Sequence, residues 1–544
     1  MKRIYKKVLT IVVGLLTLSN LSCKKMLEEK MISSIGAGNF YKTQADAVAA
    51  INSVYNELYT YDLYTQPMWN IPVLDDDHVS GASWYLGGTG AGNPQNYFGV
   101  DGPWVGFYKV IARANVVLEK VGPMTGINTT IQNRILGEAY FLRGWSYFML
   151  VQFYGPVPIR LKSLSVDPNA DVPRSPVLDV YNQIFSDLKL ASTNLLPPGD
   201  PNGGESGRVN RAVADAFLAK AYLTIAACAA PTVNINVRTG DVNSNAVYTH
   251  TKTVVAGYEA IDSKAYFELA RQKATEVINN YAANYPLFTS IKDMWAKGNR
   301  NKGEHMWELQ SLDGSAFVNQ LNTYFSCVST FGRGAVYMTN TEYNDYEDQD
   351  LRALEGVAHN YVQNTTTATK NFYPLRLAAK YQVVNGVTYT NNGTTDERAY
   401  IIKFSDVSSP LIASSDAYYP FMRFAEVYLM LAEAENEVNG PTGIAYNALN
   451  MTRNRAKASV APAGMTKDTF RDFVLAERAR EFALENGTRH FDLIRWGIYL
   501  SVMNKITKSQ DNVVKTRTNR NLLMPIPVSE LNTNKLIGSN NPGW

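Results

Sequence analysis

Histidine and the short motifs of enzyme active sites are scarce in this chain. Its 544 residues include only five histidines, at positions 78, 250, 305, 359 and 490. A catalytic triad that uses histidine as its base therefore has few candidates. The nucleophile elbow, the phosphate-binding loop and the dinucleotide fingerprint are also absent from the sequence. These absences argue against an enzyme and give no indication of a bound cofactor.

Cysteine, net charge and long apolar runs are limited as well. The chain has three cysteines, and the sequence does not decide whether Cys228 and Cys327 form a disulfide. The formal net charge of +3 becomes −1 once the four cations of residues 1–23 are removed, so no nucleic-acid partner is expected, because phosphate binding needs a basic surface. After residue 23, no segment reaches the roughly 18 uninterrupted apolar residues of a membrane-spanning helix.

The first 23 residues have the layout of a secretory signal. Basic residues precede an apolar run at 8–18, and small residues follow before Cys23. A bacterial lipoprotein signal places the cysteine that becomes lipidated at this point, and an ordinary buried cysteine is the alternative. We therefore expect a lipoprotein signal peptide over 1–23, lipidation at Cys23, and a tether with an N-terminal extension over 24–42.

Helical periodicity dominates the remainder of the chain. It predicts amphipathic helices at 43–60, 103–121, 131–153, 176–195, 209–229, 264–281, 420–438, 443–457 and 467–486. Small residues alternate with large ones, as at Ala214, Leu218 and Tyr222, in a pattern similar to tetratricopeptide-type helix pairs. We predict a mainly α body over 43–544, with a helical scaffold at 43–64, 103–282 and 420–500.

Two stretches of different character interrupt this scaffold, at residues 65–102 and 283–419. They are rich in Gly, Asn, Thr and Tyr, and short β-like pieces occur at His305–Leu309 and at 400–404. Loops of this length in a folded protein are usually functional. We therefore expect these two stretches to form a loop-rich, ligand-binding face.

Aromatic rings and polar side chains in these stretches are suited to sugars. A pyranose packs its apolar face on an aromatic ring, whereas its hydroxyls need amide or charged partners. The predicted ligand contacts are Trp84, Tyr85, Asn93, Tyr97, Tyr324, Phe331 and Arg333. The alternative is that these aromatic residues only anchor long loops to the helical body.

The segment around 475–497 interleaves charge with apolar bulk. At about 100° per helical residue, Glu477, Glu481 and Glu485 share one sector with core-type residues. A glycosidase could use such carboxylates as acid and base, but carboxylates paired with arginines are poor general acids. We predict a structural ion-pair network made of Glu477, Arg478, Glu481, Glu485, Arg489, Asp492 and Arg495.

The run Asp75, Asp76, Asp77 and His78 is a weak candidate for a metal site. Adjacent residues seldom converge on one ion, and no spaced calcium-loop or zinc motif occurs in the sequence. A solvated turn or a helix cap is the favoured interpretation, and no metal site is predicted.

Several further motifs are distributed along the chain. They are the Met-Leu-Glu-Glu run at 26–29 after Cys23, Leu-Arg-Gly at 142–144, Phe-Tyr-Gly-Pro-Val-Pro at 153–158, Leu-Ala-Glu-Ala at 431–434, Arg-Asn-Arg-Ala at 453–456, the charged segment 477–497, Pro-Ile-Pro at 525–527 and the final Asn-Pro-Gly-Trp. With these motifs the chain resembles, nearly end to end, the SusD/RagB family of outer-membrane nutrient-binding lipoproteins.

The resemblance implies an α-helical fold with tetratricopeptide-like pairs and a non-catalytic role. Such proteins hold an oligosaccharide, or in some members a peptide, at the cell surface for import. Their partner is a TonB-dependent outer-membrane transporter of the SusC type, and their lipid anchors them to the outer membrane. We expect a glycan-binding protein of this kind; the alternatives are a peptide-binding member and, less favoured, a glycoside hydrolase.

Overall fold

The computed structural model describes residues 40–169, 171–362, 370–373, 383–384, 387–388 and 394–544. The predicted signal peptide, the lipidation site at Cys23 and most of the predicted tether lie outside these residues. The described part is mainly helical and matches the predicted fold class.

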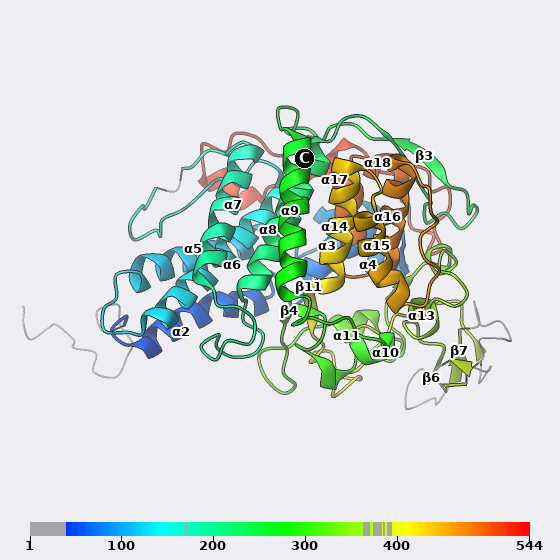
Figure 1. Cartoon of the computed structure of the whole chain (residues 1–544), viewed down its shortest axis with the longest axis horizontal. Coiled ribbons are helices and arrows are strands. Elements are labelled where there is room, and N and C mark those ends of the chain that lie inside the picture. The colour runs from blue at the N-terminus through cyan, green and yellow to red at the C-terminus, as the bar shows by residue number, and fades with distance from the viewer. Residues whose placement is uncertain (1–39, 170, 363–369, 374–382, 385–386, 389–393) are drawn as a thin grey trace, which may run out of the picture.

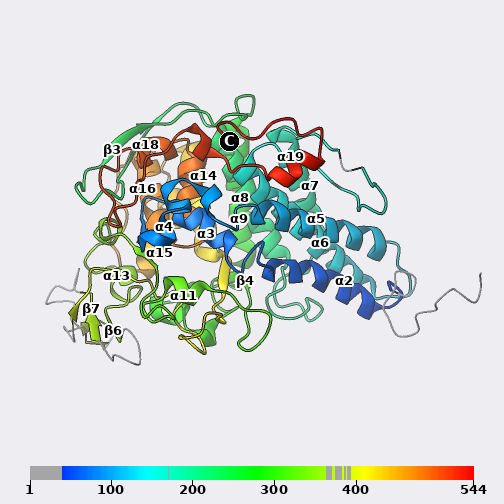
Figure 2. The same cartoon turned by 180° about the vertical axis from the view of Figure 1, so that it is seen from behind.

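Long helices form a continuous array across the molecule (Figures 1 and 2). Helices α5 to α9 each pack against the next, α9 packs against α14, and both α15 and α16 pack against α14. Their bounds are Gly102–Val121 (α5), Thr129–Tyr154 (α6), Val177–Asn194 (α7), Arg211–Ala229 (α8), Ser263–Tyr281 (α9), Phe424–Asn439 (α14), Gly443–Arg455 (α15) and Lys467–Glu481 (α16). Residues 283–419 are therefore an insertion between two helices that pack against each other.

Local sequence signals explain where these helices begin and how closely they approach. Side chains of Asn128, Asn210 and Asp262 accept hydrogen bonds from backbone N–H groups in the first turns of α6, α8 and α9. Gly144 of α6 faces α7, where a Cβ atom would lie 2.9 Å from the Cβ of Asp187. The glycine thus permits close helix packing.

Helix α2 (Gln44–Asn56) packs along α5 and α6, and the short helix η3 (Glu57–Tyr59) follows it. The predicted stretch 65–102 folds into short elements, namely α3 (Pro67–Leu74), β1 (Val79–Gly81), α4 (Ser83–Leu86), η4 (Thr89–Ala91) and η5 (Pro94–Asn96). The insertion also contains short pieces, namely α10 (Ile291–Met294), η6 (Lys297–Asn299), β4 (His305–Leu309), α11 (Leu321–Phe325), β5 (Val336–Met338), α12 (Asn340–Tyr343), α13 (Leu351–Leu354), β6 (Asn360–Val362), β7 (Lys370–Phe372), β8 (Val383–Val384), β9 (Val387–Thr388) and β10 (Thr394–Thr395).

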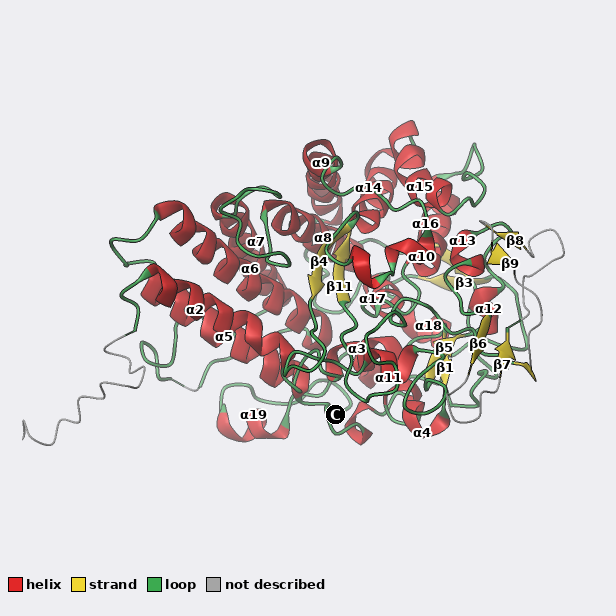
Figure 3. Ribbon diagram, turned by 90° about the horizontal axis from the view of Figure 1, so that it is seen from below, coloured by secondary structure: helices red, strands yellow, loops and turns green. Residues whose placement is uncertain are grey.

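Two strand pairs tie the insertion to the rest of the chain. β4 pairs with β11 (Tyr419–Arg423), which leads directly into α14. β1 pairs antiparallel with β5, with Ser80 opposite Tyr337, and Figure 3 shows these strands side by side. Gly81 is required there, because a Cβ atom would lie 2.0 Å from the carbonyl oxygen of Ala335. The two predicted loop stretches are therefore joined by backbone pairing.

The predicted strand at His305–Leu309 is confirmed as β4, but three other boundaries were wrong. Residues 420–423 belong to β11, so the helix predicted from 420 begins at Phe424. The predicted strand at 400–404 is limited to a single bridge at Ile401. The charged helix ends at Glu481 rather than at 486, because Leu484 and Asn486 adopt positive φ angles, as does Gly487.

The chain after α16 continues through α17 (Thr488–Arg495), α18 (Tyr499–Met503), η8 (Asn519–Leu522) and α19 (Val528–Thr533), while β2 (Asn234–Val237) and β3 (Tyr248–Thr251) form a hairpin between α8 and α9. Among the described residues, α8 is long and apolar enough to span a membrane, but 94% of its apolar window is buried inside the protein. α8 is therefore a core helix. Cys228 and Cys327 are both buried and both free.

Candidate ligand-binding site

Four aromatic side chains from the two loop-rich stretches meet at one place. Trp84 and Tyr85 lie on α4, Tyr324 lies on α11, and Phe331 follows it in the next loop. The rings of Tyr85 and Tyr324 stack at 4.2 Å with planes 10° apart, and Trp84 meets Phe331 edge-on at 5.4 Å. We name these four residues the aromatic platform.

The outer rings of the platform are available to solvent. Trp84 is 64% exposed and Phe331 is 49% exposed, whereas Tyr85 and Tyr324 are partly covered. Below them, the fully buried Trp69 of α3 lies 5.7 Å from Tyr324, centroid to centroid. Carbohydrate stacking needs exposed aromatic rings on a rigid base. When a ligand covers such rings, apolar surface leaves water and the free energy of the system falls.

The pairing of β1 with β5 explains why the platform forms. The backbone N–H of Ala82, directly before α4, donates to the carbonyl of Ala335 at 2.8 Å. This bond holds α4 against the segment that carries Phe331. Burial raises the pKa of the Tyr85 hydroxyl well above its ordinary value. The hydroxyl itself is buried, so the ring of Tyr85 supports Tyr324 from inside the protein.

A second group of rings borders the platform. Tyr61 stacks on Phe98 at 5.8 Å, and its hydroxyl donates to the side-chain oxygen of the buried Gln66 at 2.5 Å. Tyr97 packs against Phe98 and is itself almost fully buried. Tyr61 and Gln66 were not among the predicted ligand contacts. Tyr61 lies in the segment 43–64, which was assigned to the scaffold. Its exposed position after η3 could not be predicted, because no periodic pattern in the sequence indicates it.

Asn93 and Arg333 both make polar contacts within the protein. The side-chain oxygen of Asn93 accepts a 2.7 Å hydrogen bond from Arg520, in the C-terminal tail. Arg333 forms a 2.6 Å ion pair with Asp396. Both polar groups already have partners within the protein, and their roles as ligand contacts remain predictions.

The carboxylates of the charged segment form a buried ion-pair lattice. Glu477 contacts Arg352 at 2.6 Å and Arg453 at 2.7 Å, and Glu481 contacts Arg423 at 2.9 Å. Further pairs within the lattice join Glu481 to Arg352 and Arg455, Glu485 to Arg423 and Lys403, and Glu304 to Arg423 and Arg455. Glu477 also pairs with Arg480 of α16 itself. The other partners of Glu477 and Glu481 in the described part of the chain lie outside the predicted network.

The remaining residues of the predicted network pair in a second group. Arg478 contacts Asp492 at 2.7 Å and Glu426 at 3.2 Å, while Arg495 pairs with Asp492 and Glu433. Arg489 instead reaches Asp77, 412 residues earlier in the chain, at 2.9 Å. That contact fixes the start of the segment that leads into β1 and α4.

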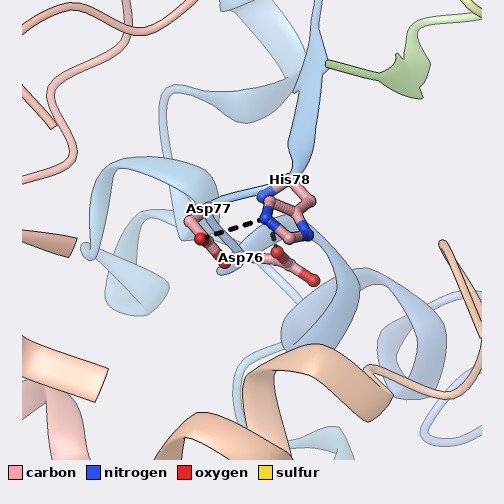
Figure 4. Close-up of side chains that lie close together, drawn as sticks. All are labelled: Asp76, Asp77 and His78. Carbon is pink, nitrogen blue, oxygen red and sulfur yellow. Dashed lines mark hydrogen bonds and ion pairs between the residues drawn. The ribbon is translucent and has the colours of Figure 1, made fainter. Parts of the chain in front are cut away.

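Asp75, Asp76 and Asp77 are buried and His78 is partly buried, so the interpretation of this run as a solvated turn was wrong. Ligand-type atoms of Asp76, Asp77 and His78 lie within 4.8 Å of one another (Figure 4). However, Asp77 already accepts two hydrogen bonds from Arg489, and His78 pairs with Glu342 at 2.9 Å. The charges of Asp77 and His78 are thus met by protein groups, and these contacts anchor the segment that leads into β1 and α4.

Protonation in this cluster follows from burial and close charges. Burial, and then the negative charge of Asp77, raises the pKa of Asp76 to about 7. For His78, burial favours the neutral ring, but Asp77 and Glu342 outweigh it and raise the pKa to about 9. His78 is therefore an imidazolium at neutral pH.

The ion-pair lattice is poorly suited to acid–base catalysis. Burial opposes the charge of Glu477, but Arg352, Arg480 and Arg453 lower its pKa to about 2. A carboxyl group that stays ionised at neutral pH has no proton to give to a leaving group. The lattice accordingly joins α16 to α15, to β11 and to the insertion 283–419 through ion pairs.

Comparisons with known proteins agree with this architecture. A family model described as "Starch-binding associating with outer membrane" matches residues 22–223, and the model of the SusD family matches residues 313–544. The chain belongs to the SusD/RagB family. This SusD-like chain is 24% identical to SusD-like protein P25 of Formosa agariphila, over 97% of both chains, and 26% identical to a SusD-like protein of Bacteroides ovatus, over 74% of this chain and 66% of the relative.

Solved structures show the same fold. A SusD homolog from Bacteroides thetaiotaomicron superposes with a TM-score of 0.70 at 23% identity, covering 93% of this chain and 98% of the homolog. A structure named a laminarin-binding SusD-like protein gives a TM-score of 0.67 at 21% identity, covering 93% of this chain and all of that one. The SusD-like fold expected from the sequence is thus confirmed.

Proposed function

We propose that this protein is a non-catalytic glycan-binding lipoprotein that holds an oligosaccharide on the aromatic platform. The observation that carries the proposal is the meeting of Trp84, Tyr85, Tyr324 and Phe331 at a solvent-exposed place. The starch-binding description of the matching family model and the laminarin-binding name of one structural relative support the same ligand class.

The platform suits a sugar because it offers two ring faces at an angle. The planes of Trp84 and Phe331 are inclined by 73°, so a pyranose that lies on one ring also contacts the edge of the other. The hydroxyl of Tyr85 is buried, so Tyr85 offers a ring edge rather than a hydrogen bond to the ligand. Stacking on the exposed rings therefore supplies the affinity of the platform.

We further propose that a lipid on Cys23 anchors the protein to the outer surface of the outer membrane, where it passes the oligosaccharide to a TonB-dependent transporter of the SusC type. The association of the family with the outer membrane supports this assignment. Co-purification of a transporter with the full-length chain, and its loss on Cys23→Ala, would test the partner and the anchor together.

Substitution of Trp84 tests the ligand site. In the form that lacks residues 1–23, Trp84→Ala should weaken glycan binding about tenfold, equivalent to about 1.4 kcal/mol, because a stacking face is lost. Leu164→Ala, at a similarly exposed apolar side chain outside the platform, is the control and should leave the affinity unchanged. Isothermal titration with the glycan selected on an array measures both. Equal affinities for all three proteins would refute the assignment, and binding of peptides in place of glycans would favour the peptide-binding alternative.

A further inference from the structure

A groove, distinct from the aromatic platform, lies at the end of α2, next to β4. Figure 2 shows this end of α2 close to β4, on the face that also carries α11. The groove has a volume of about 370 Å³ and opens to solvent. Its lining comes from the end of α2 and η3, from the loop at 205–208, and from the segment 307–317, part of the same insertion that supplies Tyr324 and Phe331.

The groove combines aromatic rings with side-chain amides. Tyr59 meets Phe317 edge-on at 4.9 Å, and Phe317 is 42% exposed. Amides of Asn52, Asn56 and Gln310 line the same space. This mixture of ring faces and amides is the chemistry that a sugar needs, and the aromatic platform offers the same ring chemistry.

The charged groups in the groove offer no free cation to an acidic ligand among the described lining residues. Arg208 lies over the ring of Tyr55 at 5.5 Å and pairs with the buried Glu138 at 2.8 Å and with Glu205. Glu308 is buried and accepts a 2.6 Å hydrogen bond from the backbone of Asn301. The carboxylate of Glu205 is 75% exposed, and Arg208, the cation among the described lining residues, is already engaged with two carboxylates. The groove therefore favours a neutral saccharide over an acidic one, which the exposed carboxylate would repel.

Exposed rings connect the groove to the platform. Tyr59 and Tyr61 are two residues apart, so their Cα atoms are separated by at most about 7 Å. Tyr61 stacks on Phe98, and its hydroxyl bonds to Gln66, the same side chain that hydrogen-bonds the hydroxyl of Tyr324. From Tyr324 the ring contacts continue to Phe331. A chain of side-chain contacts thus links the region of Tyr61, next to the groove, to the platform.

We propose that the groove is a second subsite, which holds further units of the same neutral glycan chain whose other end lies on the aromatic platform. The inference rests on the proposed glycan-binding function. Two connected subsites raise the effective concentration of one end of a chain once the other end is bound. Affinity therefore increases with chain length until both subsites are filled.

A length series of one glycan tests this subsite. An array of neutral and acidic linear oligosaccharides first selects the tightest neutral ligand, and its homologues from two to eight units are then titrated. Phe317→Ala should weaken binding of the longest homologue about tenfold and leave the shortest unchanged, whereas Trp84→Ala should weaken all lengths. Phe317→Tyr keeps the ring and should restore the length dependence, which excludes a loss of folding as the cause.

The outcomes separate the subsite from the function on which it rests. If Trp84→Ala weakens binding but Phe317→Ala leaves the length dependence intact, the subsite is refuted and the glycan function stands. If only acidic glycans bind, the neutral character of the subsite is refuted. If the wild-type protein binds no glycan on the array, both proposals fail.

Discussion

Replacement of Arg423 by methionine should destabilise the protein strongly. The guanidinium of Arg423 is fully buried and pairs with three buried carboxylates, those of Glu304, Glu481 and Glu485. Methionine fills a similar volume but leaves negative charge without this partner. Removal of one member of a buried ion pair typically costs 3–5 kcal/mol.

The remaining contacts place the expected loss at the lower end of that range. After the substitution, Glu304 and Glu481 keep Arg455, and Glu485 keeps Lys403. We therefore expect the free energy of unfolding to fall by about 3 kcal/mol. Because urea is uncharged and does not screen ion pairs, urea unfolding followed by circular dichroism is the suitable assay.

Lys109→Met is the matched control for the removal of one cation. Lys109 pairs with Asp62 at 2.6 Å, and both side chains are substantially exposed. Exposed pairs contribute about 0.2–1 kcal/mol, so this variant should unfold close to the wild-type urea midpoint. A loss below about 1 kcal/mol for Arg423→Met would refute the view that the lattice is a main support of the fold.

Two further predictions concern pH. The pKa of Glu477 is lowered to about 2 in the fold. The contribution of Glu477 to stability is therefore present above about pH 4.5 and is lost as the pH falls toward 2. Glu477→Gln should flatten this part of the profile of urea midpoint against pH. The pKa of His78 is raised to about 9, so its contribution is complete below about pH 6.5 and is lost as the pH rises through 9; His78→Gln should remove that alkaline decline, and an unchanged profile would contradict the ion pair with Glu342.

The helical array could be predicted from the sequence because its signals are local. Helices α5 to α9 begin and end within a few residues of the predicted bounds, since their apolar periodicity and their stops are written within each segment. β11 was missed because it is short and directly precedes α14. Apart from Arg423, its five buried residues are apolar or proline, and such a run can equally be the first turn of the following helix.

Long-range pairing could not be predicted in this way. The charge of Glu481 indicated a buried ion pair, but its partners Arg352, Arg423 and Arg455 lie far from it in sequence. Helical spacing rules apply only to residues three or four positions apart. Similarly, Asp77 appeared to be a solvated turn residue because nothing near it in sequence indicates Arg489.

Composition identified all four residues of the platform as candidates, but it did not separate them from Asn93, Tyr97 and Arg333, which have other contacts in the structure. The ring types at Trp84, Tyr85, Tyr324 and Phe331 suggested sugar contacts, and the structure brings these four together. Asn93 was chosen because amides bind hydroxyls, yet the structure uses it to hold Arg520. Residue type shows what a side chain can bind, whereas the tertiary fold decides what it does bind.

A glycan array tests the aromatic platform most directly. It is probed with two proteins that lack residues 1–23: the wild type and a double variant that carries both Trp84→Ala and Phe331→Ala. Both substituted side chains are exposed, so the double variant should keep the wild-type urea midpoint. If the aromatic platform holds the glycan, the wild-type protein binds at least one class of oligosaccharide and the double variant loses this signal. Equal signals from the two proteins, or no glycan binding by the wild type, would contradict the assignment of the aromatic platform as a glycan site.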